Sequence, residues 1–220
     1  MMSILKRETF LIRLNGDKLA DIKAKFNALP SGILDLCGKR GIDNFSVWHV
    51  SGLVFGYYEV TKEYDLTDAD KAALSAFAAS LAECGEIIGN AFTQPMRLMY
   101  SDIGIVREDK SLIRHRVFAT QLKPGCAEEY KRRHDELTAS KGGVISEGPE
   151  SDFTIWNAEN YIFGYCELVR SFDHEMTEEE RASTIAWETR GLEIMDWITD
   201  DVDWITGEKH DKIELVWQQK

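Results

Sequence analysis

The chain contains two similar halves, and this repeat constrains its fold more than any other feature of the sequence. When the sequence is shifted by 108 residues and compared with itself, identical residues align without a gap. The string Phe55-Gly56-Tyr57-x-Glu59 aligns with Phe163-Gly164-Tyr165-x-Glu167. Further identical pairs are Phe10 and Phe118, Leu14 and Leu122, Lys23 and Lys131, Leu29 and Leu137, Phe45 and Phe153, and Trp48 and Trp156. A long fixed period of this kind predicts two structurally equivalent units.

The hydrophobic pattern predicts the same order of elements in both repeats: strand, helix, strand, strand, helix, strand. For the first repeat we expect strands at 9–14, 44–50, 53–61 and 96–100, and helices at 18–36 and 67–88. For the second repeat we expect strands at 116–122, 152–157, 161–169 and near 215–217, and helices at 126–140 and after the capping box of Thr177 and Glu180. Aligning the last strands requires about seven extra residues in the second repeat, between about 199 and 210.

This order is that of a ferredoxin-like βαββαβ unit in the α+β class. Helices cover one face of such a sheet, and the other face needs a partner. Two copies in one chain can supply that partner for each other, so we expect a pseudo-dimeric α+β barrel that is compatible with a monomer. The expected domains are residues 1–100, a linker at 101–113, and residues 114–220.

The composition excludes several classes of partner. The net charge of -12 disfavours binding to nucleic acid and to anionic membranes. The first residues show no apolar signal-peptide segment, and four widely separated cysteines suggest no disulfide framework, so we expect a cytoplasmic protein. The histidines lack metal-ligand spacing and there is no phosphate-binding glycine loop, so we expect neither a metal nor a cofactor.

The repeats differ where chemistry would be expected. On the first long helix, the first repeat has Ile22 and Phe26 at core spacing, whereas the second has Tyr130 and His134. Residues four apart lie on one helix face, so the phenol and the imidazole should be neighbours, and Arg133 borders them. A polar residue at a core position is more informative than an exposed one, and we take this pair as the candidate site.

The string Glu128-Glu129-Tyr130-Lys131-Arg132-Arg133-His134 resembles the L-rhamnose mutarotases, which carry a similar string after the first strand of a ferredoxin-like unit. The resemblance covers the second repeat, and the first would be a degenerate copy. It implies that His134 is the proton donor and that Tyr130 contacts a monosaccharide. The chain departs from the family at Phe153, where a tyrosine is expected, and at Glu188, which follows Trp187 in place of a second aromatic residue.

The expected activity is the interconversion of the α and β anomers of L-rhamnose or a related 6-deoxy sugar. The candidate catalytic residue is His134, because histidine titrates near neutrality and can donate and accept a proton in turn. The candidate substrate-binding residues are Tyr130, Arg133, Phe153, Trp156, Trp187 and Glu188.

Several alternatives remain open. The first alternative is a cofactor-independent oxygenase, because those enzymes share the fold. The second is a non-catalytic sugar-binding or assembly module, because the first repeat has already lost the polar pair. Trp187 aligns with Phe77 at a spacing of 110, so it can be a core aromatic residue, and Arg133 can be a solvated helix charge. Trp204, within the extra segment, could belong to a lid or continue a helix face.

Overall fold

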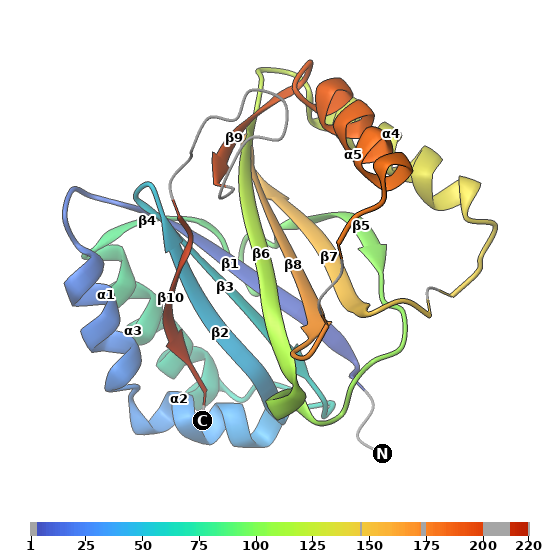
Figure 1. The fold of residues 1–220 in the computed structure, drawn as a ribbon. Coiled ribbons are helices and arrows are strands. Elements are labelled where there is room, and N and C mark those ends of the chain that lie inside the picture. The colour runs from blue at the N-terminus through green and yellow to red at the C-terminus, as the bar shows by residue number, and fades with distance from the viewer. Residues whose placement is uncertain (1–3, 146, 173–174, 200–211, 220) are drawn as a thin grey trace. The chain divides into compact units, whose positions relative to one another are not determined.

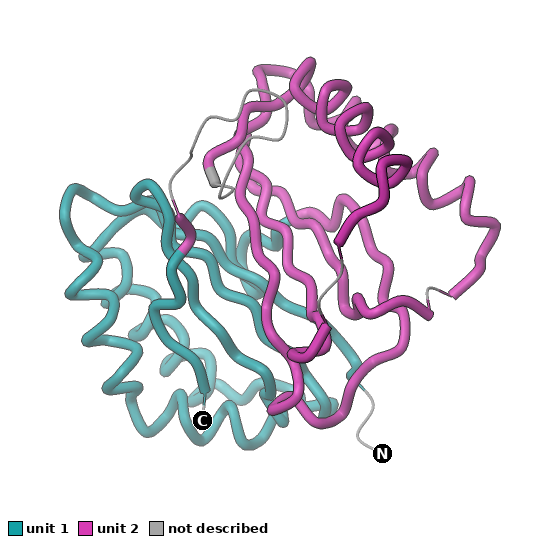
Figure 2. The backbone as a smooth tube through the Cα atoms, viewed as in Figure 1, with its two compact units in different colours: residues 1–96, 214–220 teal, residues 97–213 magenta. Residues whose placement is uncertain are grey.

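A computed structural model describes residues 4–145, 147–172, 175–199 and 212–219. The chain forms two compact units (Figure 2). Unit 1 comprises Met1–Met96 and Glu214–Lys220, and unit 2 comprises Arg97–Ile213. Residues 200–211, which include Trp204 and most of the expected extra segment, lie outside the described part of the chain.

Unit 1 is a five-stranded antiparallel sheet with helices α1 and α3 over one face (Figure 1). The strand order is β10-β2-β3-β1-β4. Its elements are β1 (Lys6–Leu14), α1 (Leu19–Asn27), α2 (Ser31–Arg40), β2 (Ile42–Val50), β3 (Leu53–Val60), α3 (Asp68–Ala82), β4 (Gly85–Gly89) and β10 (Glu214–Gln218).

Unit 2 has the same architecture, with α4 and α5 over one face of an antiparallel sheet of order β5-β7-β8-β6-β9 (Figure 1). Its elements are β5 (Arg97–Asp102), the 3₁₀ helix η1 (Lys110–Leu112), β6 (Ile113–Leu122), α4 (Ala127–Ser140), β7 (Glu150–Ala158), β8 (Tyr161–Val169), α5 (Glu178–Gly191) and β9 (Met195–Thr199). The predicted α+β class is therefore confirmed. The barrel depends on how the units are placed and stays a prediction.

Local sequence signals explain most of these elements. Thr67 and Thr177 each cap a helix through a reciprocal capping box, as predicted for Thr177. The β2–β3 hairpin turns at Ser51 and Gly52, which both have positive φ, the conformation that a two-residue hairpin turn requires. No helix in the described ranges is long and apolar enough to cross a membrane.

The structure differs from two of the predicted helices. The helix expected at 18–36 is broken into α1 and α2, because Pro30 cannot continue a helix and instead begins the second one. The helix expected at 67–88 ends at Ala82, and strand β4 follows. A Cβ atom at Gly85 would lie 2.2 Å from the carbonyl oxygen of Arg13, so only glycine allows β4 to pair with β1 at this point.

The last strand of each sheet also differs from the prediction. Residues 96–100 were expected to complete the first repeat, but β5 pairs with β7 in the sheet of unit 2. Likewise, residues 215–217 were expected to complete the second repeat, but β10 pairs with β2 in the sheet of unit 1. Each unit therefore contains one edge strand from the other half of the chain, and the domain bounds at residues 100 and 114 do not coincide with the compact units.

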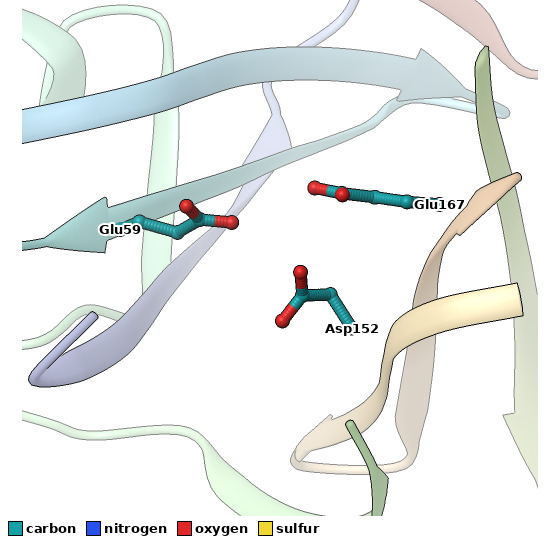
Figure 3. A group of neighbouring side chains, drawn as sticks. All are labelled: Glu59, Asp152 and Glu167. Atoms are coloured by element: carbon teal, nitrogen blue, oxygen red, sulfur yellow. The ribbon is translucent and has the colours of Figure 1, made fainter. Parts of the chain in front are cut away.

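The face of each sheet opposite the helices carries a glutamate from the repeated string, Glu59 on β3 and Glu167 on β8 (Figure 3). In unit 1, Glu59 accepts a hydrogen bond of 2.9 Å from the amide of Asn44. The position corresponding to Asn44 in unit 2 is Asp152, which cannot donate in its ionised form. Lys110 of η1 takes that role and lies 2.8 Å from Glu167 and 3.4 Å from Asp152. The two acids of unit 2 thus share a lysine counter-charge within their own unit.

The glycine of each repeated string is required by an aromatic ring. A Cβ atom at Gly164 would lie 2.0 Å from the ring of Phe118 on the neighbouring strand, and one at Gly56 would lie 1.9 Å from the ring of Phe10. Real Cβ atoms do not approach that closely, so a side chain at either glycine would displace the phenylalanine and the helix layer above it.

We therefore expect Gly164→Ala to lower the free energy of unfolding by about 1–3 kcal/mol, the usual cost of overpacking. The measurement is urea unfolding followed by circular dichroism. Gly38→Ala is the control, because a methyl group at this helical position meets nothing within 4 Å and should be neutral or slightly stabilising. Equal stability of the Gly164→Ala variant and the wild type would contradict the packing argument.

Candidate functional site

Helix α4 places Tyr130 and His134 side by side on its buried face. Their exposed fractions are 4% and 6%, although α4 is otherwise a strongly polar helix. The two rings are stacked, with centroids 4.3 Å apart. The structure thus confirms that the two residues share one helix face, and it places this face against the core of unit 2.

The tautomer of His134 follows from its backbone hydrogen bond. Nδ1 lies 2.9 Å from the carbonyl oxygen of Tyr130. A carbonyl oxygen can only accept, so Nδ1 carries the proton and donates it. In the neutral imidazole, Nε2 is then the nitrogen with a free electron pair. The bond therefore fixes both the orientation of the ring and the nitrogen that can accept a proton.

Burial favours the neutral forms of both side chains. It lowers the pKa of His134, because the charged imidazolium loses solvation, and the bond to the Tyr130 carbonyl only partly offsets this. It raises the pKa of Tyr130, and the charge of nearby Glu188 raises it further. At neutral pH the site therefore contains an uncharged base beside an uncharged phenol.

Aromatic rings from other elements surround His134. Trp187 of α5 lies edge-on to its ring, with centroids 5.4 Å apart and planes at 88°. Tyr100 of β5 contacts the ring at 5.4 Å, and Phe153 of β7 lies 5.3 Å from Tyr100. Of the predicted residues, Tyr130, His134, Trp187 and Phe153 are thus brought together, and Glu188 acts on Tyr130 through its charge.

Unit 1 repeats this arrangement of rings, with Phe26 and Trp217 in the places of His134 and Tyr100. Phe26 stands where His134 does, and Phe77 lies edge-on to it at 5.8 Å and 88°, like Trp187. Trp217 of β10 contacts Phe26 at 5.8 Å and Phe45 at 5.0 Å, in the way that Tyr100 contacts His134 and Phe153. The ring contacts by themselves therefore reflect core packing that both units share, whereas the imidazole of His134 and the phenols of Tyr130 and Tyr100 occur in unit 2.

Arg133 is engaged elsewhere. Its guanidinium donates to Glu129 at 2.7 Å, to Glu193 at 2.8 Å, and to the carbonyl oxygen of Arg190. These partners lie on α4 and at the end of α5, so Arg133 joins the two helices. The structure places it beside the aromatic group and not within it.

Trp156 is also separate from the histidine. Ile155 belongs to the core on the helix side of the sheet, and alternate residues of a strand point to opposite faces, so Trp156 lies on the other face. Its indole Nε1 donates to Thr154 at 3.0 Å. Trp48 makes the same 3.0 Å bond to Ser46 in unit 1, which marks this as a shared structural feature.

Three polar residues of the site were not predicted. The hydroxyl of Tyr100 accepts a 2.8 Å hydrogen bond from the Lys141 ammonium and donates at 3.5 Å to Asp102, and Lys141 also pairs with Asp102. All three line a cavity of about 330 Å³ together with residues 103–104, 138 and 143–145. The signal in the sequence is that Tyr100 aligns with Trp217 at a spacing of 117 when the last strands of the two repeats are compared, but sequence reasoning assigned the strand of Tyr100 to the first repeat.

Comparison with known proteins bears on the second repeat, which supplies most of unit 2 and strand β10 of unit 1. Residues 115–219 match the family model of the L-rhamnose mutarotases, which confirms the resemblance for that segment. An L-rhamnose mutarotase of Jannaschia sp. strain CCS1 is 36% identical over 59 residues, which are 27% of this chain and 57% of that protein. One of Mesorhizobium japonicum is 40% identical over 63 residues, 28% of this chain and 58% of that protein. The chain thus spans less than two thirds of the curated relatives it matches.

A solved structure from Fusobacterium nucleatum subsp. nucleatum, named "Putative monooxygenase", is 12% identical. The match covers 100% of this chain and 95% of that one, with a TM-score of 0.44.

We expect His134 to titrate below its ordinary value of 6.5 and to carry its proton on Nδ1 when neutral. Nitrogen-15 NMR of the histidine rings measures both properties, and His134→Phe assigns the signal. Because the unfolded chain takes up this proton at higher pH, the stability that neutral His134 contributes should decline as the pH falls below 6.5. Titration at or above 6.5 would contradict the burial argument.

Proposed function

We propose that unit 2 is an aldose mutarotase that interconverts the α and β anomers of L-rhamnose or a related 6-deoxy sugar. The observation that carries the proposal is the buried imidazole of His134, whose Nδ1 is committed to the Tyr130 carbonyl so that Nε2 is the proton-accepting atom. The match of residues 115–219 to the L-rhamnose mutarotases supports this choice of reaction.

The reaction needs one group that both accepts and donates a proton. Nε2 of His134 removes the proton from O1 of the pyranose, and protonation of the ring oxygen opens the ring to the aldehyde. The C1–C2 bond rotates, and the C5 hydroxyl formed from the ring oxygen attacks the other face of the aldehyde. Oxidation states do not change. A neutral histidine is suited to begin this sequence, because the neutral imidazole first accepts a proton and the imidazolium that forms can then donate one.

The surrounding residues suit a 6-deoxy sugar. The aromatic rings of Trp187 and Tyr130, which lie against His134, supply apolar surface for the C–H face and the methyl group of the sugar. Polar groups near these rings, Glu188 among them, can bind the ring hydroxyls. Arg133 and Trp156 support the site as parts of the helix pair and the sheet.

Saturation-transfer NMR with L-rhamnose, L-fucose and L-mannose tests the proposal, because it detects anomer exchange directly. Accelerated exchange of at least one sugar is the expected result. Binding without accelerated exchange would indicate a sugar-binding module. If the protein neither binds these sugars nor accelerates their exchange, the result would favour a different class of ligand, such as the aromatic substrate of an oxygenase.

We expect His134→Phe to slow anomer exchange by roughly 10²–10⁴-fold, the usual contribution of a positioned acid or base. The variant should fold, since Phe26 occupies the corresponding position of unit 1 in the same aromatic surroundings. The control is His49→Gln, which removes a histidine of unit 1. Exchange at the wild-type rate in a folded His134→Phe protein would refute the catalytic role.

The pH dependence gives an independent check. Because burial lowers the pKa of His134, its basic form is already populated at neutral pH. After subtraction of the uncatalysed rate, kcat/KM should be constant near pH 7 and should fall below an inflection that lies under 6.5. A rate that only follows the hydroxide concentration would point to uncatalysed exchange.

A further inference from the structure

Tyr100 joins the buried histidine to the cavity of unit 2. The ring of Tyr100 contacts the imidazole of His134 and the ring of Phe153, with centroid distances of 5.4 Å and 5.3 Å. Its hydroxyl is directed to Lys141 and Asp102, which line the cavity with it. Tyr100 is 5% exposed, so the phenol is held in place by its neighbours.

The cavity continues the face of α4 that carries the histidine. Thr138 and Lys141 line the cavity and follow His134 by four and seven residues, the spacing of one helix face. Thr138 also donates a 3.0 Å hydrogen bond to the carbonyl oxygen of His134. The volume of about 330 Å³ lies at the lower end of the range for small-molecule sites.

The polar groups of this wall fit a polyol. A sugar hydroxyl both donates and accepts hydrogen bonds, and here an ammonium donor, a carboxylate acceptor and a phenol that can do either are held within one hydrogen-bonded group. Phe153, directly beside Tyr100, has no hydroxyl to offer. In unit 1 the corresponding aromatic residue is Trp217, which packs on Phe26 and Phe45 and has no phenol.

We propose that Tyr100, together with Lys141 and Asp102, binds a ring hydroxyl of the sugar and positions the sugar for His134. The proposal rests on the proposed function and adds a residue to it. Tyr100 lies on β5, ahead of residues 115–219 that match the mutarotase family, so this specificity element comes from a different part of the chain.

Tyr100→Phe in the full chain tests this, because it removes the hydroxyl and keeps the ring that packs on His134. The dissociation constant for L-rhamnose, measured by calorimetry, should rise roughly five- to twentyfold, the contribution of one or two hydrogen bonds. KM should rise in parallel, and kcat should change by less than about threefold, because the proton-transfer group is untouched.

The control is Tyr165→Phe, which removes another buried phenol of unit 2, one bonded at 3.0 Å to Glu167, and should leave sugar affinity unchanged. A set of deoxy-rhamnoses gives a readout that a purely structural role would not move. The analogue that lacks the hydroxyl bound by Tyr100 should bind the wild type and Tyr100→Phe equally well, whereas the other analogues should still distinguish them.

Equal affinity of Tyr100→Phe and the wild type for L-rhamnose would overturn the proposal. So would a loss of affinity that is the same for every deoxy analogue, since it would indicate a structural change. If the wild type binds L-rhamnose without accelerating anomer exchange, the mutarotase activity is refuted. The proposal for Tyr100 is then decided by the affinity measurements alone. Absence of binding by the wild type to every sugar would overturn both.

Discussion

In each unit a phenylalanine, on β1 in unit 1 and on β6 in unit 2, packs directly on a glycine of the neighbouring strand. This contact sets how closely the layer of side chains above the sheet can pack. Phe118 lies on Gly164, and Phe10 lies on Gly56, at distances that leave no room for a Cβ atom. Because the phenylalanine ring lies directly against the backbone of the sheet, a second layer of aromatic side chains fits between this ring and the helices. In unit 2 that second layer contains His134.

The candidate site is therefore a modified core. The same edge-on and tilted ring contacts occur in both units, and in unit 1 Phe26, Phe77 and Trp217 make them without an imidazole. Placing an imidazole in such a core costs solvation, which depresses its basicity and favours the neutral form. One backbone carbonyl then decides which ring nitrogen is available. In the described part of unit 2, a backbone carbonyl thus orients a neutral base.

The sequence predicted those parts that depend on local signals. The polar pair Tyr130 and His134 was found because an equivalent apolar position could be compared within the same chain, and the capped helix after it depends on a short motif. Strand β4 was missed because the need for Gly85 comes from a carbonyl on a distant strand. Tyr100 was missed because alternation identifies a strand but not the sheet that it joins, so its alignment with Trp217 was attributed to the wrong unit.

The exchanged edge strands have a consequence for how the protein is made. Unit 1 has most of its residues before position 97, but its strand β10 begins at Glu214. On a ribosome, the first unit would emerge with the edge of β2 unpaired and would wait for the whole of unit 2 to be synthesised before that edge is covered. Unit 2 already has β5 when its own strands appear. The later half of the chain can therefore complete its sheet first, in the reverse of the order in which the two halves are translated.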